Sequence, residues 1–153
     1  MAERLRRLLP ALWAGVLLCI ALIATPAPFA LLARADAGRV VARIFVQEAW
    51  LSLALAMLLL ALERSRALAA AQSGRGSVLS TEMLLVLGTV FCTVAGYFGV
   101  QTMMPAARAG QGVFSFGQLH ALSFALFGGK TALLLALTWR AAGPENLNPA
   151  PSS

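Results

Sequence analysis

The sequence predicts an all-α membrane protein built as a bundle of four transmembrane helices. The chain has 153 residues, of which 59% are hydrophobic and 12% charged, and its mean hydropathy is +0.80. Soluble domains carry about 25% charged residues, so this composition excludes a water-soluble core. Four apolar stretches reach the roughly 20 residues that cross about 30 Å of hydrocarbon. Backbone in lipid must satisfy its own hydrogen bonds, so these stretches are helices.

The apolar stretches place the four helices at about 8–32, 40–62, 83–104 and 119–139. No connection between them is long enough for a folded soluble domain, so residues 1–142 are expected to form a single transmembrane domain. The final segment, 143–153, is rich in proline and is expected to be a disordered tail.

The first helix runs without a charge between Arg7 and Arg34 but contains Pro26 and Pro28. Each proline removes a backbone N–H and disfavours helical geometry in the preceding residue, so helix 1 should be kinked or broken there. Its basic start also resembles a secretory signal with a cleavage site at 33–35. The apolar stretch is far longer than the roughly 7 to 15 residues of a signal core, so we expect a retained anchor.

Basic residues in the short flanking segments set the expected orientation. They are more frequent before helix 1, between helices 2 and 3 and after helix 4 than on the opposite side. By the positive-inside rule both termini are expected to face the cytoplasm. Trp13 and Trp139 then suit an aromatic belt at that interface. Because these basic residues flank apolar segments, the net charge of +6 does not indicate a nucleic-acid partner.

Two opposite charges, Glu48 and Lys130, lie near the middle of helices 2 and 4. Each costs about 2.5–3.5 kcal/mol at the bilayer centre on insertion scales. At 1.5 Å of rise per residue, Glu48 lies roughly 12 Å and Lys130 roughly 16 Å below the non-cytoplasmic surface, and the lysine stem leans back toward the glutamate. We therefore expect an intramembrane salt bridge. It either fixes the register of helices 2 and 4 or serves transport or proton relay.

Other polar residues lie nearer the same surface. Arg43, only about 5 Å deep, can snorkel to the headgroups. His120 and Ser123 lie three residues apart on one side of helix 4. His120 can titrate, donate a hydrogen bond or, with Met103 and Met104, offer soft ligands to Cu(I). Their spacing is not diagnostic of a metal site, so neither a metal nor a cofactor is predicted.

Small residues recur every fourth position on two helices. Gly88, Cys92 and Gly96 form such a stripe on helix 3, and Gly15 and Cys19 form a shorter one on helix 1. Such stripes let another helix approach closely, so we expect bundle packing or dimerisation there. The two cysteines predict neither a disulfide nor a metal motif. No nucleophile, phosphate-binding or metalloprotease motif appears, so an enzyme is not expected.

Four short motifs carry a family resemblance. They are Leu12-Trp13-Ala14-Gly15, Pro26-Ala27-Pro28-Phe29-Ala30, Ala37-Gly38 leading to Arg43-Ile44-Phe45, and Phe116-Gly117-Gln118-Leu119-His120-Ala121-Leu122-Ser123. On these motifs the chain resembles the bacterial domain-of-unknown-function family 4149, which is similar to the eukaryotic transmembrane protein 205. The resemblance implies a four-helix membrane domain with no established activity. It carries over the signature positions Trp13, Gly15, Pro28, Phe29, Gly38, Phe45, His120 and Ser123.

The chain departs from the family pattern on helix 4. Ala121 stands where the family often has glycine, and a polar residue is expected near Phe127, which weakens a polar site on that helix. A looser likeness in hydropathy and in the outer histidine is to the copper resistance D membrane proteins. That likeness supports metal handling only by analogy.

These observations lead to two function classes. The first is a non-enzymatic interaction or assembly subunit that sits in the lipid bilayer with a membrane-protein partner or a second copy. The alternative is a small transporter or copper-type metal-handling protein that uses Glu48, Lys130 and His120. A hydrated cavity that touches Glu48 would favour the alternative, whereas a dry and fully paired core would favour the first class.

Overall fold

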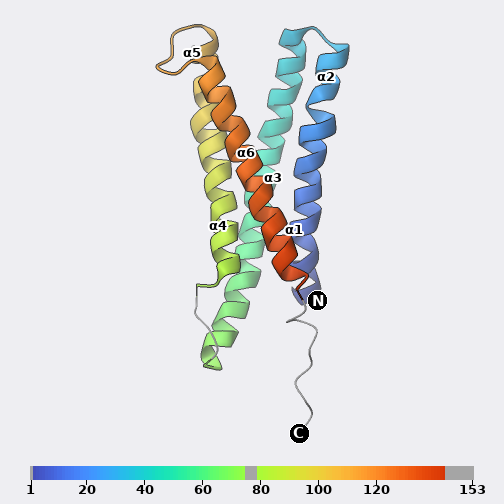
Figure 1. Ribbon diagram of the computed structural model, residues 1–153, viewed down its shortest axis with the longest axis vertical. Coiled ribbons are helices and arrows are strands. Elements are labelled where there is room, and N and C mark those ends of the chain that lie inside the picture. The colour runs from blue at the N-terminus through green and yellow to red at the C-terminus, as the bar shows by residue number, and fades with distance from the viewer. Residues whose placement is uncertain (1, 75–78, 144–153) are drawn as a thin grey trace.

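The computed structural model describes residues 2–74 and 79–143, which are almost entirely helical (Figure 1). The elements are α1 (Ala2–Cys19), the π-helical segment η1 (Ile20–Ala24), α2 (Pro26–Leu31), α3 (Arg34–Gln72), α4 (Thr81–Thr93), the π-helical segment η2 (Val94–Val100), α5 (Gln101–Arg108) and α6 (Phe116–Ala141). They form four runs long and apolar enough to span a membrane. No strand occurs in the described ranges, so the predicted all-α, four-helix fold is confirmed. Of the expected disordered tail, residues 144–153 lie outside the described residues.

The first run does not break at its prolines, contrary to the expectation from sequence, and its bend is small. The backbone widens instead into η1, where the N–H of Thr25 donates to the carbonyl of Ile20 at 2.9 Å. Pro26 then occupies the first position of α2, where a missing N–H costs nothing. A π-helical turn thus accommodates both prolines within one continuous run.

The second run, α3, is 39 residues long and extends well past the expected end at residue 62. Its alanine-rich final part stays helical because alanine has the best helix propensity. The helix stops just before Gly74, which has a φ of 71° that favours glycine. At the start of α6, Ser115 and Gln118 form a reciprocal capping box, which fixes where the fourth run begins.

The four runs form a bundle whose two ends differ. We call the end that holds the start of α1 and the end of α6 the terminal end, and the opposite end, which holds α2 and α5, the loop end (Figure 1). α6 crosses the bundle, packing on α5 and α4 and on α1. At the loop end α2 packs on α3 and α5 packs on α6, but within the described residues no Cα of α2 lies within 8 Å of a Cα of α5 or α6. The two helical hairpins therefore diverge toward the loop end.

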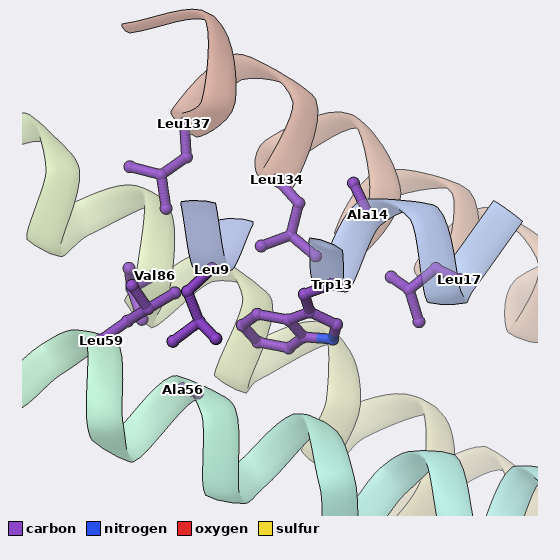
Figure 2. Close-up of a cluster of buried hydrophobic side chains, with 9 residues drawn as sticks. All are labelled: Leu9, Trp13, Ala14, Leu17, Ala56, Leu59, Val86, Leu134 and Leu137. Carbon is purple, nitrogen blue, oxygen red and sulfur yellow. The ribbon is translucent and has the colours of Figure 1, made fainter. Parts of the chain in front are cut away.

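The main hydrophobic core joins α1, α3, α4 and α6 (Figure 2). Its buried members are Leu9, Trp13, Ala14, Leu17, Ala56, Leu59, Val86, Leu134 and Leu137. Trp13 is 1% exposed, so the expectation that it belongs to an interfacial aromatic belt is wrong: the indole ring fills the space between helices. Trp139, by contrast, is 84% exposed, as such a belt requires.

Candidate functional site

The structure brings Glu48 and Lys130 together. The Nζ of Lys130 lies 2.6 Å from Oε1 of Glu48, and both side chains are almost fully buried. Glu48 belongs to α3 and Lys130 to α6, and among the described residues no Cα of α3 lies within 8 Å of a Cα of α6. The two long side chains therefore bridge helices whose backbones do not touch.

A chain of hydrogen bonds ties this ion pair to the first helix. The hydroxyl of Ser52 donates to Oε1 of Glu48, and the indole Nε1–H of Trp13 donates to Oγ of Ser52 at 3.1 Å. Both hydrogen bonds to Glu48 fall on Oε1, and no donor from the described part of the chain reaches Oε2. The carboxylate is thus held in place by α1, α3 and α6 but keeps acceptor capacity for a further partner.

Two phenylalanines form a second link between α3 and α6. The rings of Phe45 and Phe127 meet edge to face with centroids 5.6 Å apart, and each lies three residues before its charged neighbour on the same helix face. The Nζ of Lys130 also lies 5.2 Å from the centre of the Phe127 ring, within cation–π range. An aromatic layer therefore covers the ion pair on the side of the loop end.

A small cavity of about 30 Å³ borders the ion pair. This volume holds one or two water molecules, and the polar groups around it can bind them. The lining residues are Phe45, Glu48, Cys92, Thr93, Gly96, Tyr97, Gln101, Ser123, Leu126, Phe127 and Lys130. The charged groups thus lie beside a small cavity with some polar lining rather than in a fully packed core.

A larger cleft of about 400 Å³ lies next to this cavity, toward the loop end. Its walls come from both hairpins, and it shares Phe45, Gln101, Ser123 and Phe127 with the small cavity. The cleft is lined by Ala21, Thr25, Phe29, Gly38, Val41, Ala42, Phe45, Gln101, Met104, Arg108, Phe116, His120, Ser123, Phe124 and Phe127. Since the shared residues separate the two spaces, the cleft leads from the loop end to the aromatic layer above the ion pair.

Both π-helical segments border these spaces. Ala21 of η1 lines the cleft, while Gly96 and Tyr97 of η2 line the small cavity. A π-helical turn is poorer in hydrogen-bond geometry than an α-helical one and is found frequently at functional sites. The backbone irregularities of this fold are therefore concentrated where the interior is open.

The remaining polar candidates divide between the cleft and the outer surface. His120 and Ser123 both line the cleft, and the His120 ring stacks on Phe116 with centroids 5.8 Å apart. Met104 lines it as well, but Met103 does not. Arg43 is exposed and lines neither space. Across the described ranges no group of three His, Cys, Asp or Glu side chains is placed to hold a metal ion.

The two small-residue stripes have different surroundings. A Cβ added to Gly88 would lie 2.9 Å from Cδ1 of Leu133, and Cys92 and Gly96 also face α6. This stripe packs within the bundle. Gly15 and Cys19 are exposed, and nothing lies within 4 Å of a Cβ built on Gly15. The expectation that this stripe packs against another helix of the same bundle is therefore wrong. Its use in dimerisation stays a prediction.

Sequence reasoning missed a second buried ion pair, at the terminal end. The Nη1 of Arg6 lies 3.1 Å from Oε1 of Glu63, and Arg6 also bonds Glu3. Neither Arg6 nor Glu63 was predicted to have a partner. Their pairing could have been expected from their positions, because helices 1 and 2 are antiparallel and place both residues at the same end of the bundle. Ser52 was missed too, although it lies one helical turn after Glu48.

The fold and these sites define a multi-pass membrane protein with a four-helix domain. Residues 8–112 match the family described as a domain of unknown function, DUF4149. This match covers more than half of the chain, so the protein belongs to that family. The match ends before α6, so the Phe116 to Ser123 motif and Lys130 lie outside it. No curated protein and no solved structure matches the chain.

Proposed function

We propose that this protein is a non-enzymatic membrane protein that binds a small solute in the cleft at its loop end, as a transporter or carrier does. The observation that carries this proposal is that the cleft lies directly next to the small cavity that borders a buried ion pair. Pockets of about 300–1,000 Å³ with mostly apolar walls and a few polar groups are typical of small-molecule sites. A dry core around Glu48 would instead have favoured a purely structural pair.

Glu48 has the central role in this proposal. Buried charges within membrane spans mark solute or proton pathways when they border a polar space. Its Oε1 is held by Ser52 and Lys130, while Oε2 has no donor among the described residues, and Glu48 lines the small cavity. A proton or a solute that binds there alters the attraction between α3 and α6. Because these helices are linked mainly through side chains, such binding would change how far the hairpins diverge.

Native mass spectrometry of the purified protein in detergent tests the binding proposal. The wild-type protein should carry a bound small molecule that Ala42→Trp removes, because Ala42 lines the cleft and an indole would fill it. Ala125→Trp is the matched control, since Ala125 is exposed and lines neither space. Equal occupancy in both variants would count against the cleft as the binding site.

The proposed setting is a bacterial inner membrane with both termini in the cytoplasm. The excess of arginine near the terminal end supports this orientation. It places the cleft at the non-cytoplasmic face, open to solutes from outside the cell. A phosphatase fused to the C-terminus, active only outside the cytoplasm, should be inactive, and an active fusion would reverse the orientation. The similarity to eukaryotic transmembrane protein 205 remains an inference from the motifs.

A second candidate function is assembly with another membrane protein or a second copy. It is favoured by Gly15 and Cys19, whose exposed small side chains leave a flat strip on α1. A symmetric dimer through this strip would bring two Cys19 thiols together. Mild oxidation in native membranes should then give a disulfide-linked dimer that Cys19→Ala abolishes and Cys92→Ala does not. Absence of any cross-link would argue against this interface.

A further inference from the structure

We propose that the cleft binds a single-chain anionic amphiphile, a long-chain fatty acid anion, with its carboxylate at Arg108 and its hydrocarbon chain among the phenylalanines. This inference rests on the proposed function, because it names the class of solute that the same cleft takes. It is drawn from the charge at the mouth of the cleft, the nature of its walls and its position on the bundle.

The charge comes from Arg108, the last residue of α5, which lines the mouth of the cleft. Its Cζ lies 5.2 Å from the centre of the Phe116 ring, and within the described part of the chain no carboxylate pairs with it. The stacked guanidinium is held in place by the ring and keeps its edge free for a partner. A carboxylate accepts two parallel N–H bonds from such an edge.

The mouth also offers a second donor. His120 stacks on the same Phe116 ring that Arg108 contacts, and it lines the same cleft. The loop end as a whole carries more arginine than acid: Arg39 is paired with Asp36, while Arg34 and Arg43 are both exposed. An anionic headgroup is therefore complementary in charge to this end of the protein, and a cationic one is not.

The walls below the mouth select a hydrocarbon chain. The cleft is lined by four phenylalanines, Phe29, Phe45, Phe124 and Phe127. Gly38 and Ala42 also line it, and their small side chains leave the space between the rings open. Phe116 and Phe127 are separated by roughly 16 Å along α6 at 1.5 Å per residue, so the cleft runs along most of the length of an extended long-chain fatty acid. A small hydrophilic anion would lose its hydration against these rings without replacement, which disfavours it as the ligand.

The position of the cleft gives access from the bilayer. Phe124 is 77% exposed and Phe29 is 48% exposed, so the cleft opens between α2 and α6 on the apolar side of the bundle. An amphiphile already in the outer leaflet has its carboxylate at the headgroup level, where Arg108 lies under the proposed orientation.

Binding of tritiated palmitate to the full-length protein in phosphatidylcholine nanodiscs tests this proposal. Palmitate should bind saturably, excess acetate should not displace it, and hexadecanol should compete at least about tenfold less well, because it lacks the charge. Arg108→Gln should weaken palmitate binding about tenfold or more, and Arg108→Lys should weaken it less. The matched control is Arg34→Gln, an exposed arginine at the same end that does not line the cleft and should bind palmitate as the wild type does.

Two results separate failure of this inference from failure of the proposed function. If hexadecanol competes as well as palmitate, and Ala42→Trp still abolishes binding, the cleft is a site but the anion specificity is wrong. If Ala42→Trp leaves palmitate binding unchanged, neither the ligand nor the cleft is assigned correctly. Arg108→Gln with wild-type affinity would overturn the role of Arg108, provided that the variant elutes as the wild type does on size exclusion.

Discussion

The two ends of this bundle are built from the same four helical runs but differ in how the space between them is filled. Toward the terminal end, leucines and the indole of Trp13 pack into a core whose members are almost fully buried (Figure 2). Toward the loop end, phenylalanines face glycine and alanine across a cleft of about 400 Å³. Glu48 and Lys130 lie at the boundary. Under the proposed function, the packed end supplies stability and the open end supplies the binding site.

The boundary has a simple physical origin. Large side chains at Trp13, Leu59 and Leu134 hold the helices together by close packing. Beyond this core, Glu48 with Lys130, then Phe45 with Phe127, reach across the gap between α3 and α6, whose backbones do not touch. Ser52 and Trp13 connect the two parts, because their hydrogen bonds run from the core to Glu48.

The largest effect is expected from Trp13→Ala. The change removes a fully buried ring and leaves Ser52 without its indole donor. Loss of a buried aromatic side chain costs about 3–5 kcal/mol. Unfolding in mixed detergent and SDS measures this cost, and Phe124→Ala at the exposed rim of the cleft should stay within about 0.5 kcal/mol of the wild type. Equal losses at both positions would remove the distinction between the ends.

The next effect is expected from Glu48→Gln. This change leaves the Lys130 ammonium buried without its counter-charge, and breaking a buried pair costs about 3–5 kcal/mol. Water in the small cavity should keep the loss near the lower end of that range. The exchange Glu48→Lys with Lys130→Glu should recover part of it in the same unfolding assay. A neutral single substitution would mean that the bridge contributes nothing to stability.

A smaller effect is expected where helices pack through glycine. Gly88→Ile pushes a branched side chain against Leu133, and overpacking of this kind costs about 1–3 kcal/mol. Gly15→Ile is the control with the same chemical change, because its Cβ meets open space, and it should leave the monomer's stability nearly unchanged. Thermal melting in detergent compares the two. A larger loss at Gly15 than at Gly88 would reverse the assignment of the stripes.

The smallest effect is expected from Arg140→Gln. Arg140 bonds Glu82 at 2.9 Å, but about half of its side chain is exposed. Exposed ion pairs contribute about 0–1 kcal/mol and are screened by salt. The difference in melting temperature from the wild type should therefore shrink further at high salt. A loss comparable to that of Trp13→Ala would show that charge rather than packing holds the terminal end.

The sequence was sufficient for the fold and for the pairing of Glu48 with Lys130. Length, apolar content and depth along a helix depend only on local spacing, which the sequence contains. Burial of Trp13 was not predictable in the same way, because an interfacial tryptophan and a core tryptophan have similar neighbours in sequence. The pairing of Arg6 with Glu63 likewise depends on how two antiparallel helices are rotated about their axes.

The cleft itself could not be predicted from spacing. It exists because the two helical hairpins diverge toward the loop end, and the crossing geometry of helices depends on all the side chains at their contacts. The π-helical segments were also not predicted. Pro26 and Pro28 indicated a break in helix 1, whereas the chain widens into a π-helical turn just before them, in which the N–H of Thr25 donates to the carbonyl of Ile20, and the helical run continues. Of the polar residues that line the cleft, His120 and Ser123 were identified as candidates from the sequence, but Arg108 was not.

The most direct test of the account is the reactivity of a thiol in the cleft. Ser123→Cys and Ala125→Cys, each in a background with Cys19→Ala and Cys92→Ala, place a thiol on the two opposite sides of α6 at the same depth. A water-soluble, membrane-impermeant maleimide applied to intact cells should label Cys at position 123 rapidly and Cys at position 125 hardly at all. Ala42→Trp should slow the labelling at 123. Equal, slow labelling at both positions would contradict a cleft that is open to water from the loop end as far as Ser123.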